Sequence, residues 1–156
     1  MKKNILPLRT GVGIIMLNKN NEVFVGKRKD NPGKYWQMPQ GGVDEGENYI
    51  DAMKRELSEE TGTKNIKILK ELSGWQKYEI PNYLLGKIWK GKYRGQKQKW
   101  FIVRFLGEDK EINLKTDRQE FIDWKWIKAE DLTNVIVGFK KKLYENLLPE
   151  IKMFIG

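Results

Sequence analysis

The sequence contains no cysteine and no histidine. Without cysteine the chain has no disulfide, no thiolate metal site and no cysteine nucleophile, and a reducing compartment is compatible with it. Without histidine it lacks the commonest general base and the commonest ligand of transition metals. Any proton transfer therefore falls to carboxylates, lysines and tyrosines.

Long hydrophobic runs are also missing. No apolar run approaches the roughly 18 residues of a membrane span, and the opening letters MKKNILPLRTG lack the long apolar region of a signal peptide. We therefore expect a cytoplasmic protein with no membrane partner. Its 156 residues, of which 39% are hydrophobic, suffice for one domain, which we expect to span residues 1–156.

Positive charge is abundant, with a formal net charge of +9 at pH 7. Such an excess suggests a polyanionic partner, although genome composition or solubility also produces it. Segment 80–107 carries seven Lys or Arg and no acid, with aromatic residues interleaved, a combination that suits single-stranded or terminal nucleotides rather than DNA. The alternative is a solvated loop whose aromatics cap the core, and for Trp100, within the strand-like KWFIVRF, we expect the core.

The apolar patterns predict strands at residues 10–18, 22–28, 35–42, 65–72, 99–106 and 121–127. The first two form a hairpin around the polar turn KNN, and a loop with Pro32 and Gly33 follows. A terminal helix is expected over 137–155, with an interruption or bend at Pro149. This order favours an α/β or α+β fold in which helices pack against a mixed sheet.

A further helix, expected from its N-cap Asn48 to Gly62, concentrates acids. At 100° per residue, Glu56, Glu59 and Glu60 share an arc of roughly 100°. The apolar stripe that we expect to be buried borders this arc directly: Ile50, Met53 and Leu57.

Acidic helix faces are most often solvated, and they usually carry a lysine one turn later. Neither Glu59 nor Glu60 is followed by such a partner within the helix, so we expect the cluster to lack counter-charge. A hard divalent cation would supply it through oxygen ligands. Mg²⁺ is the simplest choice, with Mn²⁺ or another divalent cation as alternatives.

A set of residues at fixed spacing resembles the full signature of the Nudix hydrolases: Gly41, Glu47, Arg55, Glu56, Glu59, Glu60 and Gly62. Seven fixed positions coincide by chance on the order of once in 10⁸ starts. The one departure is Thr63, where the family usually has an aliphatic residue, and a β-branched threonine still packs there.

The resemblance implies a loop, helix and loop packed against a mixed sheet, with divalent metals that activate water against a phosphoanhydride. The metal ligands that it implies are Gly41, Glu56, Glu59, Glu60 and Glu120. Glu120 would act as a ligand or as a general base, although a lone acid is usually a surface residue. Arg55 can tie Glu47 to the helix, and this pairing is the alternative to a direct metal role for Glu47.

Further segments resemble the RNA pyrophosphohydrolase and dinucleoside polyphosphate hydrolase branch: RTGVGI, WQMPQGG, GQKQKWF, EFIDWKW and VGFKKKLY. The substrate contacts implied by this resemblance are Arg9, Arg28, Tyr78, Lys97, Lys99, Phe139 and Lys140. Phe139 would stack a base. Its rival role is in the core, because it forms an apolar helical stripe with Leu143 and Leu147.

We therefore expect a Mg²⁺-dependent monomeric enzyme of RNA decay, which removes pyrophosphate or phosphates from the 5′-triphosphate end of RNA and leaves a monophosphate. The nearest alternative is hydrolysis of dinucleoside polyphosphates such as diadenosine tetraphosphate. A non-catalytic RNA-binding module with a decayed signature is a third interpretation. The intact glutamates, together with Arg55, argue against decay.

Overall fold

The computed structural model describes residues 6–30 and 33–155. The expected loop residue Pro32 and the opening residues 1–5 lie outside this part of the chain. Within the described ranges, no helix combines the length and the apolar character needed to cross a bilayer.

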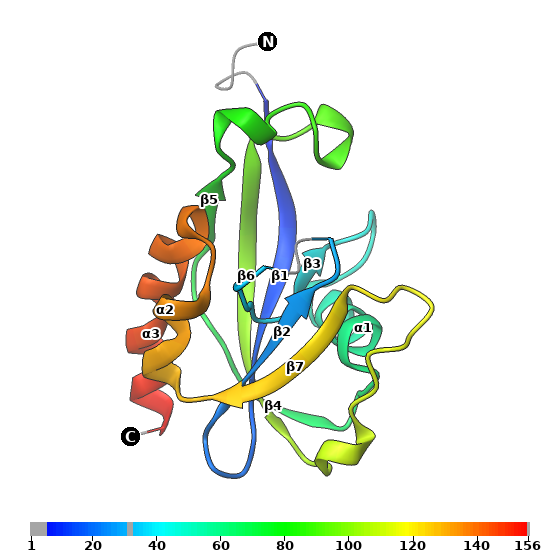
Figure 1. Ribbon diagram of the computed structural model, residues 1–156, viewed down its shortest axis with the longest axis vertical. Coiled ribbons are helices and arrows are strands. Elements are labelled where there is room, and N and C mark those ends of the chain that lie inside the picture. Colours follow the sequence, from blue (N-terminus) through cyan, green and yellow to red (C-terminus); the bar gives the residue numbers. More distant parts are fainter. Residues whose placement is uncertain (1–5, 31–32, 156) are drawn as a thin grey trace.

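The described residues form a seven-stranded mixed sheet (Figure 1). Its strands are β1 (Leu8–Leu17), β2 (Val23–Arg28), β3 (Gln40–Gly42), β4 (Ile66–Glu71), β5 (Gln76–Glu79), β6 (Gly95–Phe105) and β7 (Phe121–Ile127). The order is β4-β6-β1-β2-β7, with β3 paired to β1 and β5 paired to β6. The central strands β1 and β6 are parallel, and the other pairs are antiparallel.

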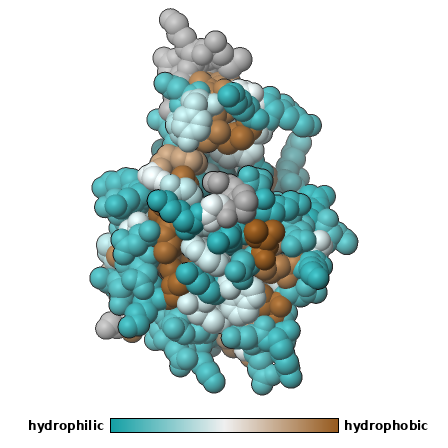
Figure 2. Space-filling model, in the orientation of Figure 1, coloured by the Kyte–Doolittle hydropathy of each residue, from teal (hydrophilic) through white to brown (hydrophobic). Residues whose placement is uncertain are grey.

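Helices cover both faces of this sheet, as the sequence predicts (Figure 1). They are α1 (Tyr49–Thr61), α2 (Leu132–Val135) and α3 (Lys141–Ile155). Successive residues of a strand point to opposite faces. Ile14 and Phe101 therefore enter a core with α1, whereas Ile15 packs in a second core with Leu147 of α3. Most side chains on the visible surface are hydrophilic, and hydrophobic ones gather in a few patches (Figure 2).

The acidic helix begins and ends where the sequence predicts. Asn48 caps α1 by accepting the backbone N–H of Asp51 at 2.8 Å, and Gly62 ends it in the left-handed conformation with φ of 77°. Met53 and Leu57 are fully buried, but the expected burial of Ile50 is wrong, because this side chain is 42% exposed. Ile50 lies in the first turn, and the buried face of α1 begins only after it.

Besides short 3₁₀ turns, the elements of the described chain that were not predicted are β5 and the short helix α2. β5 has only four residues, too few for the alternation around Tyr78 to stand out in the sequence. The expected helix 137–155 is also shorter at its start, because Gly138–Lys140 forms a separate 3₁₀ turn. Pro149 does not interrupt α3, which continues to Ile155.

Candidate active site

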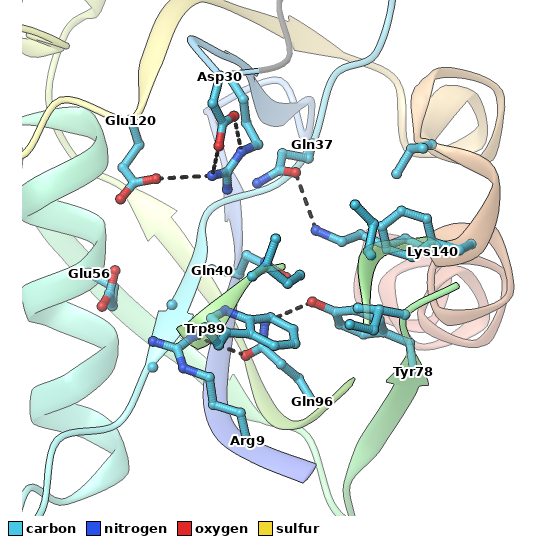
Figure 3. A pocket seen from close by; sticks show the side chains of 18 of the residues that line it. Arg9, Asp30, Gln37, Gln40, Glu56, Tyr78, Trp89, Gln96, Glu120 and Lys140 are labelled. Atoms are coloured by element: carbon cyan, nitrogen blue, oxygen red, sulfur yellow. Dashed lines mark hydrogen bonds and ion pairs between the residues drawn. The ribbon is translucent and has the colours of Figure 1, made fainter. Parts of the chain in front are cut away.

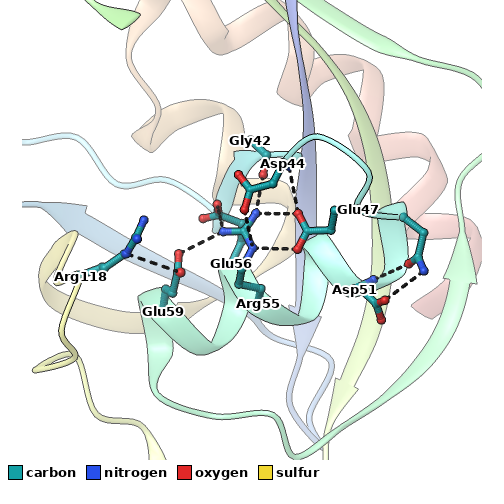
Figure 4. Close-up of polar contacts among 9 residues, drawn as sticks. Gly42, Asp44, Glu47, Asp51, Arg55, Glu56, Glu59 and Arg118 are labelled. Atoms are coloured by element: carbon teal, nitrogen blue, oxygen red, sulfur yellow. Dashed lines mark hydrogen bonds and ion pairs between the residues drawn. The ribbon is translucent and has the colours of Figure 1, made fainter.

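Arg55 of α1 is the centre of a polar cluster (Figure 4). Its guanidinium donates to both carboxylate oxygens of Glu47 at 2.9 Å, to the carbonyl of Gly42 at 2.8 Å and to Glu56 at 2.8 Å. A longer contact of 3.3 Å reaches Glu59. The hydrogen bonds from Arg55 lower the pKa of Glu47 to about 2. Arg55 therefore ties the loop before α1 to the helix, as expected from the sequence.

The expectation that the glutamates lack counter-charge is wrong for two of them. Arg55 lies one turn before Glu59 and also contacts Glu56. Arg118, in the loop before β7, approaches Glu59 to 3.9 Å. The cation missed by sequence reasoning precedes the glutamates on the helix instead of following them.

Glu60 differs from its neighbours because it has no ion pair in the described part of the chain. It is 2% exposed, and its carboxylate accepts the backbone N–H of Gln40 at 3.1 Å. Burial, and then the charge of Glu56, raise the pKa of Glu60 well above its usual range. Burial also raises the pKa of Glu56 to about 7, against the opposing effect of Arg55. Among the described residues, the charged form of Glu60 therefore has no ion-pair partner, and that of Glu56 has only Arg55.

Two glycines allow close approach from both faces of β3. A Cβ on Gly41 would lie 1.9 Å from the carboxyl carbon of Glu56. A Cβ on Gly42 would lie 2.2 Å from a guanidinium nitrogen of Arg9. Because any larger residue would collide, Gly41 and Gly42 bring an acid of α1 and a cation of β1 against the same short strand.

A cavity of about 880 Å³ opens beside these groups (Figure 3). Its ionisable and aromatic lining residues are Arg9, Arg28, Asp30, Glu56, Tyr78, Tyr83, Trp89, Glu120, Phe139 and Lys140. Glu56 and Lys140 lie on opposite sides of it (Figure 3). Several cations and aromatic rings around one hollow suit a ligand with both phosphates and bases.

Arg28 joins two acids at one edge of the cavity. It donates to both carboxylate oxygens of Asp30 at 2.8 and 2.7 Å, and it lies 3.5 Å from Glu120. The hydrogen bonds raise the pKa of Arg28 and lower that of Asp30. Glu120 thus reaches the cavity from outside the acidic helix.

Lys140 occupies the other side and is only 7% exposed. Its Nζ donates to Oε1 of Gln37 at 3.4 Å and lies 5.3 Å from the ring centroid of Tyr78. Burial, and then repulsion from Arg28, lower the pKa of Lys140 to about 7. Nε2 of Gln37 is buried without a hydrogen-bond partner among the described residues. Two neighbouring donor groups, Nζ of Lys140 and Nε2 of Gln37, thus belong to residues of this wall of the cavity.

Comparison with known proteins matches residues 7–147 to the NUDIX domain. The chain belongs to the Nudix family. An RNA pyrophosphohydrolase of Pelagibacter ubique is 58% identical over 151 residues, which cover 97% of this chain and 96% of that one. An RNA pyrophosphohydrolase of Rhodospirillum rubrum is 46% identical, and the match covers 96% of this chain and 90% of the relative. An RNA pyrophosphohydrolase of Orientia tsutsugamushi is 44% identical, and the match covers 97% of this chain and 94% of the relative.

Solved structures show the same fold. The Escherichia coli dihydroneopterin triphosphate pyrophosphohydrolase superposes with a TM-score of 0.68 at 18% identity, over 92% of this chain and 99% of its own. The Caenorhabditis elegans Ap4A hydrolase in a binary complex superposes with a TM-score of 0.67 at 22% identity. The match covers 95% of this chain and 98% of that one. At these identities the likeness concerns the Nudix fold alone.

Nudix hydrolases work with divalent cations. The acidic side chains of α1 are the residues that could bind one here. Across residues 6–30 and 33–155, no three acidic side chains already converge as a metal-binding group. The chemistry of the donors nevertheless fits a cation. Glu56 and Glu60 are buried acids with raised pKa, and Glu56 also lines the cavity. Arg55 occupies only Oε1 of Glu56, so a cation could bind Oε2 while this contact is kept.

Sequence reasoning missed a group of hydrogen-bonded polar side chains beside the Nudix cavity. Nε2 of Gln96 donates to the hydroxyl of Tyr78 at 2.7 Å, and Nε2 of Gln98 donates to Oε1 of Gln40 at 2.8 Å. The signal was present in GQKQKWF. Alternate residues of a strand share a face, so the two glutamines point with Trp100 to one side of β6.

The same alternation places Lys97 and Lys99 on the other face of β6. Their Nζ atoms lie 5.0 and 5.1 Å from the ring centroid of Trp75. Neither lysine lines the cavity. Their contact with substrate stays a prediction, and it would have to occur outside the cavity.

Two aromatic residues had competing core roles. Trp100 is 1% exposed and packs in the core beneath α3, as expected. Phe139 packs against this core and also lines the cavity. Its place in the 3₁₀ turn before α3 takes it off the helical stripe of Leu143 and Leu147. One face of Phe139 is thus left toward the Nudix cavity.

Proposed function

We propose that this chain is an RNA pyrophosphohydrolase, which uses Mg²⁺ to cleave the 5′-triphosphate end of RNA and leaves a 5′-monophosphate. The observation that carries the proposal is similarity over nearly the whole chain. RNA pyrophosphohydrolases that are 44% to 58% identical match 96% to 97% of it. We further infer a single-domain monomer that acts in the cytoplasm, in RNA decay.

The cation would be held by Glu56, Glu59, Glu60, Glu120 and the backbone of Gly41. When bound, it supplies charge for the leaving phosphate and lowers the pKa of the attacking water, and Mn²⁺ or another divalent ion would serve as well. Arg55 orients the glutamates through its fork of donors. Glu120 either joins the ligand set or accepts the proton of the water.

The cavity has separate places for phosphates and for a base. Arg9 and Arg28 face it beside the acids, where their guanidinium groups would bind phosphate oxygens. The rings of Tyr78 and Phe139, whose centroids are 6.1 Å apart, lie with Lys140 on the other side. A base stacked there would direct the 5′ phosphates toward the acids.

A second candidate substrate is a dinucleoside polyphosphate such as diadenosine tetraphosphate. The observation that favours it is a second aromatic set, Tyr83 and Trp89, which lines the same cavity. A ligand with a base at each end could use both sets. A non-catalytic module is disfavoured, because a buried acid such as Glu60 destabilises a fold that never binds a cation.

The test compares kcat/KM for triphosphorylated RNA and for diadenosine tetraphosphate with the same enzyme. We expect the higher value for RNA. Phe139→Ala should remove roughly 1 to 3 kcal/mol of transition-state stabilisation for RNA, because a stacked base is lost. Phe154→Ala, at a 39% exposed position on α3, is the control.

A higher kcat/KM for diadenosine tetraphosphate would transfer the proposal to the second substrate, and no turnover of either would overturn it. If Phe139→Ala instead lowers only the melting temperature, Phe139 belongs to the core. The expected loss of stability is then about 3 to 5 kcal/mol.

A further inference from the structure

A second group of basic and aromatic side chains lies outside the cavity, beside β2 and β7. We define it as the outer strip: Lys27, Lys34, Tyr35, Trp36 and Lys125. Nζ of Lys27 and Nζ of Lys125 lie 4.7 and 4.4 Å from the ring centroid of Trp36. Nζ of Lys34 lies 5.8 Å from that of Tyr35. Each aromatic ring of the strip thus has an ammonium group beside it.

The charge of these lysines is not neutralised by ion pairs within the described ranges. β2 and β7 are neighbours in the sheet (Figure 1), and Lys27 is paired with Asp123 across them. The Asp123 carboxylate instead accepts the backbone N–H of Trp124 at 2.8 Å. The lysines of the strip are therefore free to meet an anion.

The outer strip continues directly from the cavity. Tyr35 and Trp36 line a small hollow whose remaining walls are Arg28, Gln37, Ile136 and Val137. Arg28, Gln37 and Val137 line the large cavity as well. The backbone N–H of Trp36 donates to the carbonyl of Val135 at 2.9 Å, which fixes the strip to the segment that precedes Phe139. A chain that leaves the cavity on this side therefore meets Trp36 and Tyr35.

We infer that the outer strip binds the single-stranded RNA that follows the first nucleotides of the substrate. Bases would stack on Tyr35 and Trp36 while Lys27, Lys34 and Lys125 bind backbone phosphates. The inference rests on the proposed function. It also gives a reason to prefer RNA, because a dinucleoside polyphosphate has no nucleotide chain beyond its two nucleosides that could reach the strip.

Cation and ring contacts alone would not carry this inference. Trp75 has the same arrangement with Lys97 and Lys99, at 5.0 and 5.1 Å, yet it lies against Tyr49 of α1 and shares no wall with the cavity. Such contacts also stabilise surfaces by roughly 0.5 to 1 kcal/mol without any ligand. The distinguishing observation is the set of walls that the strip shares with the cavity.

The test uses Lys27→Gln/Lys125→Gln, with Lys19→Gln/Lys67→Gln as the control of equal charge change. Lys19 and Lys67 are exposed and lie in the β1–β2 turn and on β4. For each protein, kcat/KM is measured with a triphosphorylated dinucleotide and with an RNA of about ten nucleotides that begins with the same two. We expect the ratio of long to short to fall several-fold in the strip variant and to stay unchanged in the control.

The salt dependence of the same ratio of kcat/KM provides a second comparison between the strip variant and the wild type. Two phosphate contacts at about 0.7 each give a difference of roughly 1.4 in the slope of log affinity against log salt. Over an approximately fourfold rise in salt, the ratio for the wild type should therefore fall about sevenfold more than the ratio for the strip variant. The control variant should follow the wild type.

Equal ratios in the strip variant and the control would overturn the inference, because the lysines would then act only through net charge or would serve a protein partner. The affinity for the monophosphorylated product RNA can be measured without turnover. It therefore distinguishes failure of this inference from failure of the proposed function. If the wild type hydrolyses neither substrate, the proposed function fails. A strip variant that binds the long product as tightly as the wild type overturns the inference alone.

Discussion

At the scale of single residues, the site depends on acids held where their charge is unfavourable. Glu60 is enclosed and has no ion pair among the described residues, and the pKa of Glu56 is about 7. A buried charge without a partner is strongly destabilising, whereas a divalent cation between carboxylates removes that penalty. If these acids hold the cation as proposed, the burial that weakens the fold without metal also favours its binding.

We expect Glu60→Gln and Glu56→Gln each to lower kcat by at least about 10²-fold, because each removes charge from a metal ligand and preserves its shape. The fold should persist, since a glutamine at position 60 can still accept the N–H of Gln40. Glu45→Gln, at an exposed position of the loop before α1, is the control. The measurements are kcat at saturating Mg²⁺ and the melting temperature. Turnover near that of the wild type in both variants would exclude the metal-holding role.

The raised pKa values also predict how stability depends on pH. The ordinary carboxyl value is 4.5 and that of Glu56 in the folded protein is about 7, so the folded state binds this proton more tightly than the unfolded chain. Without divalent cations, the free energy of unfolding should therefore fall as the pH rises from about 5 to about 7, by on the order of 2 kcal/mol. The pKa of Lys140 is lowered to about 7, so its deprotonation changes the free energy of unfolding mainly above this pH range.

Calorimetry in the presence of a chelator measures this slope. Glu60→Gln and Glu56→Gln should both flatten it, and Mg²⁺ should raise the melting temperature of the wild type more at high pH than at low pH. A slope that is the same in the wild type and in both variants would show that these carboxyls are not the groups responsible.

At the scale of elements, α1 and the loop before it act as one unit through Arg55. The guanidinium joins Glu47 and the carbonyl of Gly42 to Glu56 on the helix. Gly41 then brings β3 within contact of the same carboxylate. The position of Glu56 is therefore set jointly by the helix, the loop and the strand.

Arg55→Ala should lower both stability and rate. Glu47, only 16% exposed at its side chain, would lose both hydrogen bonds from the guanidinium and keep only that from the backbone N–H of Asp44, which costs about 1 to 3 kcal/mol. Arg55→Lys should recover only part of the loss, because an ammonium cannot reproduce the fork of donors. The measurements are the melting temperature and kcat of both variants. An Arg55→Ala protein that melts and turns over like the wild type would show that the tie is absent in solution.

At the scale of the whole molecule, the sheet divides the site between two layers. Glu56 comes from α1 on one face, whereas Tyr78 of β5 and Phe139 and Lys140 of the segment before α3 come from the other (Figures 1 and 3). Between them, β3 lines the cavity with Gln40, Gly41 and Gly42. Phosphates and base can therefore be held by different layers of one small domain.

Sequence reasoning reached the acidic helix, its caps Asn48 and Gly62 and the mixed sheet, because local propensity and long-range packing agree there. It failed where a side chain's surroundings depend on register. Lys97 and Gln96 are neighbours in sequence, but the strand sends them to opposite faces, and only the pairing of β6 with β1 and β5 reveals which face holds the cavity. Sequence reasoning did predict that Arg55 ties Glu47 to the helix, but it missed that the same guanidinium also contacts Glu56 and Glu59.

We propose that this chain converts a 5′-triphosphate RNA end into a monophosphate with the acids of α1. The most direct measurement follows both products when triphosphorylated RNA is incubated with the enzyme, with and without Mg²⁺. We expect 5′-monophosphorylated RNA together with released pyrophosphate or phosphate only when the cation is present, and at least about 10²-fold slower formation of both with Glu56→Gln. RNA whose triphosphate end stays intact while Mg²⁺ is present would contradict it.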